Sequence, residues 1–580
     1  MTMRKIRQIL LTVTTILAGF HVLPASAQQI SDFGLLDQHG VFHQLSRYSL
    51  APAVALYVHA VGDEASAGAL PDLNEMAGRY RDQGIAFMVL DPVAGRTRDE
   101  VLAATDGLEA EIPVLIDSSQ VVSLDLGVTS TGEAFLLDPA SWQIIFRGAL
   151  VTGDSTRGLE ATLKAMLAGR TLSPEETRTD GVEIVGTAVD YVFEREFSQR
   201  QISYLDDIAP LLQRRCASCH VADSLAPWSM SSHRMIQGWS PMIKEVLLTR
   251  RMPPGQIDMQ VGSWQEIHHM SDQELALLVH WIDKGARRAA DEGDGDPLTQ
   301  PVEAPPEWAL GEPDMIIDIP PENVPATGVV DFRIKRADLD LEQDRWVTAV
   351  AYDVGATWVL HSVLVYALDP EVSASDTVGM MTPENAEFIS LFVPGRPQEQ
   401  FSADSAFLLR ADRDLAFKLR YITTGREAVD NTRVGLYFSD QPPRYRVRHV
   451  VLGKQAFSME AGEARHREHA QSEVFDNDVL LEAVAPQMHG RGSSTAVAVQ
   501  FPDGSRSDLL SVPNYNFNWQ LNYELVEPLL LPAGSRLLAD TLYDNSEGNP
   551  YNPDPEVDVR AGVTVQDEVF GHYVRVLEEQ

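Results

Sequence analysis

The chain has 580 residues, of which 84 are acidic and 46 basic, so its formal net charge is −38. A surface this acidic repels phosphate backbones, which excludes nucleic acid as an expected partner. The length predicts several domains, and the two cysteines allow at most one disulfide within the chain, so each domain must rely on a hydrophobic core.

The first 27 residues have the pattern of a secretory signal. Arg4 and Lys5 precede an apolar run, and the small residues at 25–27 offer a cleavage site after Ala27. The alternative is an uncleaved membrane anchor. No later stretch is long and apolar enough to cross a bilayer, so we expect an exported, periplasmic protein with no membrane span after cleavage.

Residues 28–175 alternate strand and helix patterns. The runs "PAVALYVHAV" at 52–61 and "IAFMVLDPV" at 85–93 are apolar and β-branched, which is typical of buried strands. The segment between them has helical spacing that ends at Gly84, and a later hairpin turns at 138–141. These patterns predict an α/β layer architecture.

This segment resembles the thioredoxin-like peroxiredoxin and redoxin group. The chemistry of that group needs a thiolate at the start of the helix after the first central strand. The equivalent stretch, "VHAVGDEASAGALPDLN", has no cysteine, and Asp63 lies near the usual position. Gly132 stands where the fold places a cis-proline. We therefore expect a thioredoxin-like domain over 28–175 without peroxidase or disulfide-exchange activity, kept for docking or packing.

A charged connector at about 176–200 leads to a helical block over 200–290. The text "DDIAPLLQRRCASCH" predicts one helix, and "SPMIKEVLLTRR" predicts a second that stops at two prolines. "SDQELALLVHWIDKGARR" predicts a third, which begins with a capping pattern from Ser271 to Glu274. The composition of 291–309 is that of a linker. From about 310, short alternating runs between Pro-, Gly- and Asp-rich turns predict an all-β region.

Cys216, Cys219 and His220 form a C-x-x-C-H pattern, the attachment signature of a c-type haem. Two thiols one helical turn apart can reach both porphyrin vinyl groups, and the next residue then points at the iron. A redox C-x-x-C pair needs a thiol at a helix start after a strand, whereas these cysteines follow a helical stretch. A zinc site is not expected, because the chain has no further cysteines to complete its ligand set. We expect one covalent haem c, with His220 as proximal iron ligand.

Met252 in "RRMPPG" is the candidate sixth ligand, because methionine opposite histidine favours ferrous iron and suits electron transfer. The alternative is that Met252 is only a core residue. Other methionines and histidines nearby leave that alternative open. They are Met230, Met235, Met242, Met259, Met270, His233, His268 and His269.

Residues 203–290 resemble a distinct type of cytochrome c. The resemblance rests on the C-x-x-C-H motif together with "LAPWSM", "TRRMPPG" and "WIDKGARR". It implies an all-α cytochrome c domain whose haem is attached outside the cytoplasm in bacteria. Gly255 departs from the family pattern, which has an aromatic residue after the two prolines.

The carboxy-terminal half resembles the copper type II, ascorbate-dependent monooxygenases of the peptidylglycine-hydroxylating type. The resemblance is strongest over 511–562, which begins "SVPNYNFNWQLNYELVEP". It implies two β-sandwiches, at 310–445 and 446–580, each of which holds one copper in the family.

The copper ligands of that family are mostly replaced in this chain. In the first sandwich His361 is kept, but Ser362 and Arg420 stand at the other two ligand positions. In the second, His489 is kept, but Gln487 and Val569 replace the remaining ligands. Arginine stays charged and has no lone pair to donate to a metal. Copper is therefore not expected, and His361 and His489 are residual copper positions or histidines satisfied within a core.

The sequence thus predicts an exported monohaem cytochrome that transfers electrons to or from a redox partner protein. Its flanking domains, derived from redox modules, would bind that partner or a small molecule. One alternative is an oxidoreductase, a copper monooxygenase with unusual ligands that receives electrons from the fused haem. A second is that the haem itself is catalytic, for instance as a peroxidase, if Met252 leaves the iron open.

Overall fold

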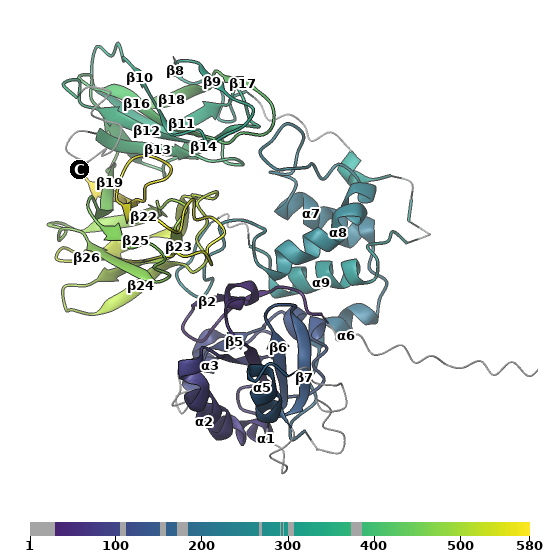
Figure 1. Cartoon of the computed structure of the whole chain (residues 1–580). Coiled ribbons are helices and arrows are strands. Elements are labelled where there is room, and N and C mark those ends of the chain that lie inside the picture. Colours follow the sequence, from purple (N-terminus) through teal and green to yellow (C-terminus); the bar gives the residue numbers. More distant parts are fainter. Residues whose placement is uncertain are drawn as a thin grey trace, which may run out of the picture.

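The computed structural model describes residues 29–104, 112–150, 158–170, 184–265, 269–289, 292–293, 295–299, 307–372 and 386–580. The expected signal segment at 1–27 and part of the expected linker at 291–309 lie outside these ranges. Figure 1 shows an α/β part, a helical part and a large all-β part in chain order. The expected multidomain organisation, with an α/β part and extensive β-sheet, is confirmed.

The α/β part is built on a five-stranded sheet with the order β5-β4-β3-β6-β7. The three strands β3, β4 and β5 are parallel, and β6 and β7 are antiparallel to their neighbours. The central strand β3 is buried at all five positions, as its apolar, β-branched sequence predicts. The strands are β1 (Gly34–Leu36), β2 (Phe42–Gln44), β3 (Val54–Val58), β4 (Ala86–Asp91), β5 (Val114–Ile116), β6 (Glu133–Asp138) and β7 (Gln143–Ala149).

Helices cover this sheet and its edges (Figure 1). They are α1 (Glu64–Ala67), α2 (Leu70–Tyr80), α3 (Arg98–Ala104), α4 (Val121–Asp125) and α5 (Leu159–Leu167), with short 3₁₀ turns η1 (Leu45–Tyr48) and η2 (Arg81–Gln83). The helix α2 ends as predicted near Gly84, which adopts a left-handed conformation with φ 73°.

The helical part packs against the α/β part and shares one hydrophobic core with it. That core joins sheet residues such as Leu56 and Phe135 to helix residues such as Leu212, Ile243 and Leu278. The elements are α6 (Val192–Ser198), the π-helical turn η3 (Tyr204–Ile208), α7 (Ala209–Arg215), α8 (His233–Leu248), α9 (Asp272–Asp283) and the 3₁₀ turn η4 (Pro297–Thr299). The predicted capping box is present at α9, where Ser271 and Glu274 each bond to the other's backbone N–H.

Two helix boundaries differ from the prediction. The first helix does not run through the cysteines, because α7 ends at Arg215 and Cys216 leaves the helical region with φ −130°. The second begins at His233 rather than at Ser240, so Pro241 lies inside α8. Proline cannot donate to the carbonyl of Gln237, but the Ser240 hydroxyl donates to that carbonyl at 2.9 Å. This bond satisfies the acceptor and lets the helix continue.

The all-β part consists of two sandwiches joined by one continuous sheet. A nine-stranded sheet passes from the first half to the second through the parallel pair β15 and β19. The four-stranded sheet β10-β16-β12-β13 covers it in the first half, and β21-β26-β23-β24 covers it in the second.

The first half of the all-β part contains the strands β8 to β18. They are β8 (Met315–Asp318), β9 (Glu322–Val324), β10 (Arg333–Ala337), β11 (Arg345–Asp353), β12 (Leu360–Leu368), β13 (Ala386–Phe392), β14 (Gln398–Gln400), β15 (Ser405–Leu409), β16 (Asp414–Tyr421), β17 (Ala428–Asp430) and β18 (Arg433–Ser439). Those of the second half are β19 (Tyr445–Lys454), β20 (Ser458–Met459), β21 (His466–Gln471), β22 (Val479–Ala485), β23 (Gly492–Gln500), β24 (Arg506–Val512), β25 (Tyr523–Leu531), β26 (Arg536–Tyr543), β27 (Val559–Arg560) and β28 (Phe570–Glu579).

The loop after α8 ties the helical part to the second sandwich. The N–H of Asp258 donates to the carbonyl of Ser511 at 2.9 Å, and the N–H of Gln265 donates to the carbonyl of Glu524 at 2.7 Å. In the described part of the chain, no helix is long and apolar enough to cross a membrane.

Candidate functional site

Cys216, Cys219 and His220 lie on a single turn that follows α7. The N–H of His220 donates to the carbonyl of Cys216 at 3.0 Å, a bond between residues four apart, which gives this segment the geometry of one helical turn. The turn is stabilised from the preceding helix, since the N–H of Cys216 donates to the carbonyl of Leu212 at 2.9 Å. The thiol spacing on which the haem prediction depends is therefore present, although α7 ends at Arg215, whereas the predicted helix runs through His220.

The imidazole of His220 is held in one orientation. Its Nδ1 lies 3.0 Å from the backbone carbonyl of Trp228, and a carbonyl can only accept, so Nδ1 carries the proton. The lone pair is then on Nε2, which is the atom that binds a metal in this tautomer. Burial lowers the pKa of His220, which keeps the ring neutral and able to act as a ligand.

Both cysteines are free thiols. Burial, with a smaller contribution from the neighbouring Cys219, raises the pKa of Cys216 to about 12. Burial also raises the pKa of Cys219. A thiol with a raised pKa is a poor nucleophile for disulfide exchange, which speaks against a C-x-x-C redox pair. The residues present fit covalent haem attachment, with two reduced thiols and an adjacent histidine whose Nε2 lone pair is available.

The Cys219 side of the turn faces the first sandwich. A Cβ built on Gly395 would lie 3.3 Å from the Cys219 sulfur, so the loop between β13 and β14 closely approaches this thiol. A cavity of about 490 Å³ opens beside it, lined on one side by Ser218, Cys219 and residues 221–226 and on the other by residues that include Leu360, Phe392 and Trp519. Much of its lining is apolar, which suits an uncharged small molecule.

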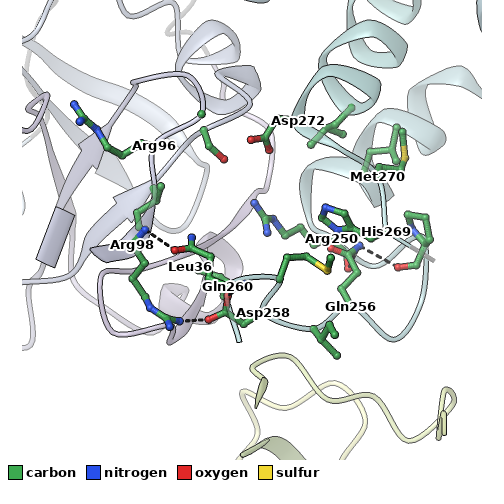
Figure 2. A pocket seen from close by; sticks show the side chains of 18 of the residues that line it. Leu36, Arg96, Arg98, Arg250, Gln256, Asp258, Gln260, His269, Met270 and Asp272 are labelled. Carbon is green, nitrogen blue, oxygen red and sulfur yellow. Dashed lines mark hydrogen bonds and ion pairs between the residues drawn. The ribbon is translucent and has the colours of Figure 1, made fainter. Parts of the chain in front are cut away.

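Met252 lies in the loop after α8 and lines a different cavity, of about 190 Å³, between the helical part and the α/β part. Figure 2 shows this cavity, where Arg98 forms an ion pair with Asp258 and where Arg250 and His269 come from the helical part. Met270 also lines it. Met252 is thus placed in an interface between parts, and its role as axial ligand stays a prediction.

The surroundings of Gly255 account for the glycine at this position, where the cytochrome c resemblance implies an aromatic residue. Its φ is 69°, and a Cβ at this position would lie 2.1 Å from a methyl carbon of Leu521 in the second sandwich. Any larger residue here would clash with Leu521, and only glycine adopts this conformation without strain. The aromatic residue of the family pattern is therefore excluded by the contact between the helical part and the second sandwich.

His361 lies at the start of β12, where its nitrogen atoms are occupied by protein groups. Its Nε2 donates to the carbonyl of Asn518 at 2.7 Å, and Arg420 Nη1 lies 3.5 Å from the ring nitrogens. Burial, and then the charge of Arg420, lowers the pKa of His361 to about 3. The neighbouring Ser362 is fully buried, and its hydroxyl has no hydrogen-bond partner in the described structure.

His489 lies in the loop before β23 and is also buried. Its Nδ1 donates to the carbonyl of Asp567 at 3.0 Å, and its ring packs between Phe332 and Phe517. Burial, and then the charge of Lys418, lowers the pKa of His489 to about 3. Within the ranges that the structure describes, no group of three or more His, Cys, Asp or Glu side chains is placed to hold a metal ion.

Asp63 occupies the N-cap of α1 in the α/β part and is bound by three hydroxyl groups. Ser66 donates at 2.6 Å, Thr131 at 2.5 Å and Thr187 at 3.0 Å. Thr187 belongs to the connector between the α/β and helical parts. A carboxylate therefore takes the place where the thioredoxin-like group has its thiolate, and the connector lies directly on it.

The connector continues along the α/β part in an extended conformation. The N–H of Thr131 donates to the carbonyl of Thr187 at 2.8 Å, and the N–H of Val189 donates to the carbonyl of Thr129 at 3.0 Å. These bonds form an antiparallel bridge between Ser130 and Ala188. Sequence reasoning missed this contact because no local pattern links residues 63, 131 and 187. It also missed Trp228, whose role depends on a backbone carbonyl rather than a side chain.

The sheet order, with three parallel strands followed by an antiparallel hairpin, makes the α/β part thioredoxin-like, as the sequence predicts. No family model and no curated protein matches the chain. The solved structures that resemble this chain over about a quarter of its length include three bacterial proteins, and this likeness concerns the fold alone.

A hypothetical protein from Sinorhizobium meliloti is 22% identical, with a TM-score of 0.25, and the match covers 29% of this chain and 94% of that chain. Peroxidoxin BcpB from Mycobacterium tuberculosis is 15% identical, with a TM-score of 0.21, and the match covers 26% of this chain and 100% of that chain. A thiol-disulfide oxidoreductase from Bacteroides fragilis is 15% identical, with a TM-score of 0.21, and the match covers 24% of this chain and 99% of that chain.

Proposed function

We propose that this chain is an exported c-type cytochrome that carries one covalent haem and transfers single electrons. The observation that carries the proposal is the turn from Cys216 to His220, in which two reduced thiols precede a histidine whose Nδ1 donates to the carbonyl of Trp228. A ligating histidine requires its other ring nitrogen to be fixed by a hydrogen bond, and that bond is present.

The chain's residues have separate tasks in this proposal. Cys216 and Cys219 would form the thioether links, His220 Nε2 would bind the iron, and Met252 is the proposed second protein ligand. A bound haem would supply one-electron chemistry, and a methionine ligand would favour its reduced state. Both thiols are half-buried at the end of α7.

The parts on either side of the haem turn have binding roles in this proposal. The α/β part has no cysteine, and its Asp63 is already bonded to the connector, so it serves as a packing module. The cavity beside Cys219 is a candidate site for a small molecule that exchanges electrons at the attachment side. Export is part of the proposal, and the signal pattern at 1–27 and the attachment of c-type haem outside the cytoplasm support it.

An optical spectrum tests the proposal. Protein made in a host that attaches c-type haem should show sharp reduced-state bands that survive denaturation, because the haem is covalently bound. Cys216→Ala should weaken attachment, and Cys216→Ala combined with Cys219→Ala should abolish it. Protein without haem bands, or bands unchanged in the double variant, would refute the proposal. Copper bound in their place would favour the monooxygenase alternative.

A further inference from the structure

A cavity of about 390 Å³ lies between the α/β part and the second sandwich, and no residue of the haem turn lines it. One wall comes from β2 and η1, and the other comes from the sheet β21-β26-β23-β24. Figure 1 shows β2 on the side of the α/β part that is turned toward the second sandwich. The two walls are joined where Arg47 Nη2 donates to the side-chain oxygen of Asn514 at 2.9 Å.

The sheet turns a polar face toward this cavity. In β21 the exposed residues Arg467 and His469 alternate with the buried Glu468, so their side chains point away from the core of the sandwich. Leu542 in β26 pairs with Arg467 on one side and with Ser494 on the other. Arg467 and Ser494 therefore lie on the same face of the sheet, two strand spacings or roughly 10 Å apart, and both line the cavity.

Three arginines line the cavity, and none of them forms an ion pair with a described residue. Arg47 bonds to the neutral amide of Asn514, and its guanidinium carbon lies 5.3 Å from the ring centre of Phe42. The side chains of Arg465 and Arg467 form no hydrogen bond within the described part of the chain, and both are exposed, so solutes can reach them. Because the chain has 84 acidic and 46 basic residues, three unpaired arginines around one cavity are not expected from its composition.

Two carboxylates line the same cavity, and both are engaged by other groups. Asp540 forms ion pairs with His469 and with Arg506, the latter at 3.2 Å. Asp544 accepts the backbone N–H of Ser546 at 2.9 Å and its hydroxyl at 2.6 Å. The charge of Asp544 acts on one of the three arginines from a distance, but it accepts no hydrogen bond from any of them. The cavity therefore keeps an excess of positive charge.

Arginines from the two walls lie near the hydroxyl of Tyr48. Burial, and then Asp37, raises the pKa of Tyr48 to about 12, whereas the charges of Arg47 and Arg465 both oppose that rise. Because the effect of a charge falls with distance, Arg47 of η1 and Arg465 of the second sandwich both lie close to this group. Guanidinium groups gathered around one cavity repel one another, and a bound anion would offset that repulsion.

We propose that this cavity, which we call the basic cavity, binds a small polyanion, a molecule with two or more phosphate or carboxylate groups. Guanidinium groups donate paired hydrogen bonds to the oxygens of such groups, and the Ser494 hydroxyl, which has no partner among the described residues, supplies a neutral donor. Arg47 would hold the ligand from the α/β part, and Arg465 and Arg467 would hold it from the second sandwich. Binding would thus tie the two parts together, and the inference does not depend on the haem.

Calorimetric titration of the full-length protein with pyrophosphate and with citrate, at low ionic strength, tests the site. We expect saturable binding of one molecule per chain for at least one of them, and binding of acetate that is at least about tenfold weaker. Pyrophosphate binding alone would identify phosphate groups as the ligand, and citrate binding alone would identify carboxylate groups. Arg467→Gln should weaken binding at least about tenfold, because it removes charge-assisted hydrogen bonds. Arg47→Gln should weaken it as well, because the ligand is held from both walls.

Arg444→Gln is the matched control, since it removes the same charge from an exposed arginine that pairs with Glu579 outside the cavity. It should leave binding unchanged, and thermal unfolding without ligand should show that each variant folds. The proposal would be overturned if neither pyrophosphate nor citrate binds, or if Arg467→Gln binds as tightly as the original chain. Equal weakening in Arg444→Gln and Arg467→Gln would also overturn it, because the effect would then come from net charge rather than from the cavity.

Discussion

The Nδ1 atom of His220 lies 3.0 Å from the backbone carbonyl oxygen of Trp228. This single bond decides which nitrogen can act as a ligand, because the carbonyl accepts and the lone pair must then be on Nε2. Trp228 is itself held by stacking on Trp239, with ring centres 5.5 Å apart. The direction of the imidazole is therefore set by the loop that follows it.

Replacing Met252 tests the proposed second ligand. If Met252 binds the iron, Met252→Ala leaves an open coordination position, and the ferrous protein should bind carbon monoxide much faster than the original chain does. The matched control is Met259→Ala, since Met259 lines the same cavity but is 44% exposed. Equally rapid binding by the unmodified protein would contradict the ligand role of Met252 and favour a catalytic haem.

Thr131→Val should loosen the connector. The Thr131 hydroxyl donates to Asp63 and accepts the N–H of Thr187 at 2.7 Å, and valine can do neither. We expect a loss of about 1 kcal/mol in the free energy of unfolding. Hydrogen exchange at the amides of Thr187 and Val189 should become faster. Thr299→Val, at an exposed hydroxyl in η4, is a control that should leave these two amides protected. Unchanged exchange in Thr131→Val would show that the connector is held by other contacts.

The same contact should weaken in acid. Burial opposes ionisation of Asp63, but hydrogen bonds from Ser66, Thr131 and Thr187 outweigh it and hold its pKa at about 2. Because the folded pKa is below the unfolded value, the stabilisation is fully present above about pH 4 and is lost as the pH falls through 2. Asp63→Asn should flatten this part of the curve of stability against pH. A curve with the same slope in Asp63→Asn would assign the acid sensitivity to other carboxylates.

Ser240→Ala should destabilise α8. The Ser240 hydroxyl satisfies the Gln237 carbonyl, which Pro241 cannot reach with an N–H, so its removal leaves that carbonyl without this donor. The expected cost is about 1 kcal/mol in denaturant unfolding. In Ser240→Ala combined with Pro241→Ala, the alanine N–H restores a helical bond and should recover stability. Absence of that recovery would mean that the serine acts through packing.

These examples show which features were predictable from the sequence. The capping box of Ser271 and Glu274 and the buried strand at Val54–Val58 were predictable because both depend on residues close together in the chain. The start of α8 was not predictable, because proline normally indicates the start or the end of a helix. Only the three-dimensional structure shows that the Ser240 hydroxyl bonds to the carbonyl that Pro241 leaves without a donor.

Contacts between distant segments account for the remaining differences. The sequence indicates that Asp63 replaces a thiol, but not that Thr187 would bind it across 124 residues. The resemblance to copper monooxygenases implies that Arg420 stands at a ligand position, but not that its guanidinium donates to the Phe517 carbonyl and to Asn518 of the second sandwich. The glycine at 255 is a departure in the sequence and becomes explicable only through its contact with Leu521.

The most direct test of the central claim is the quantification of iron, copper and covalent haem in one preparation of the full-length protein, made in a host that attaches c-type haem. The account predicts one iron per chain, all of it in haem that stays with the polypeptide after denaturation, and no stoichiometric copper. Two coppers per chain that are lost in His489→Ala, or iron without covalently attached haem, would contradict it.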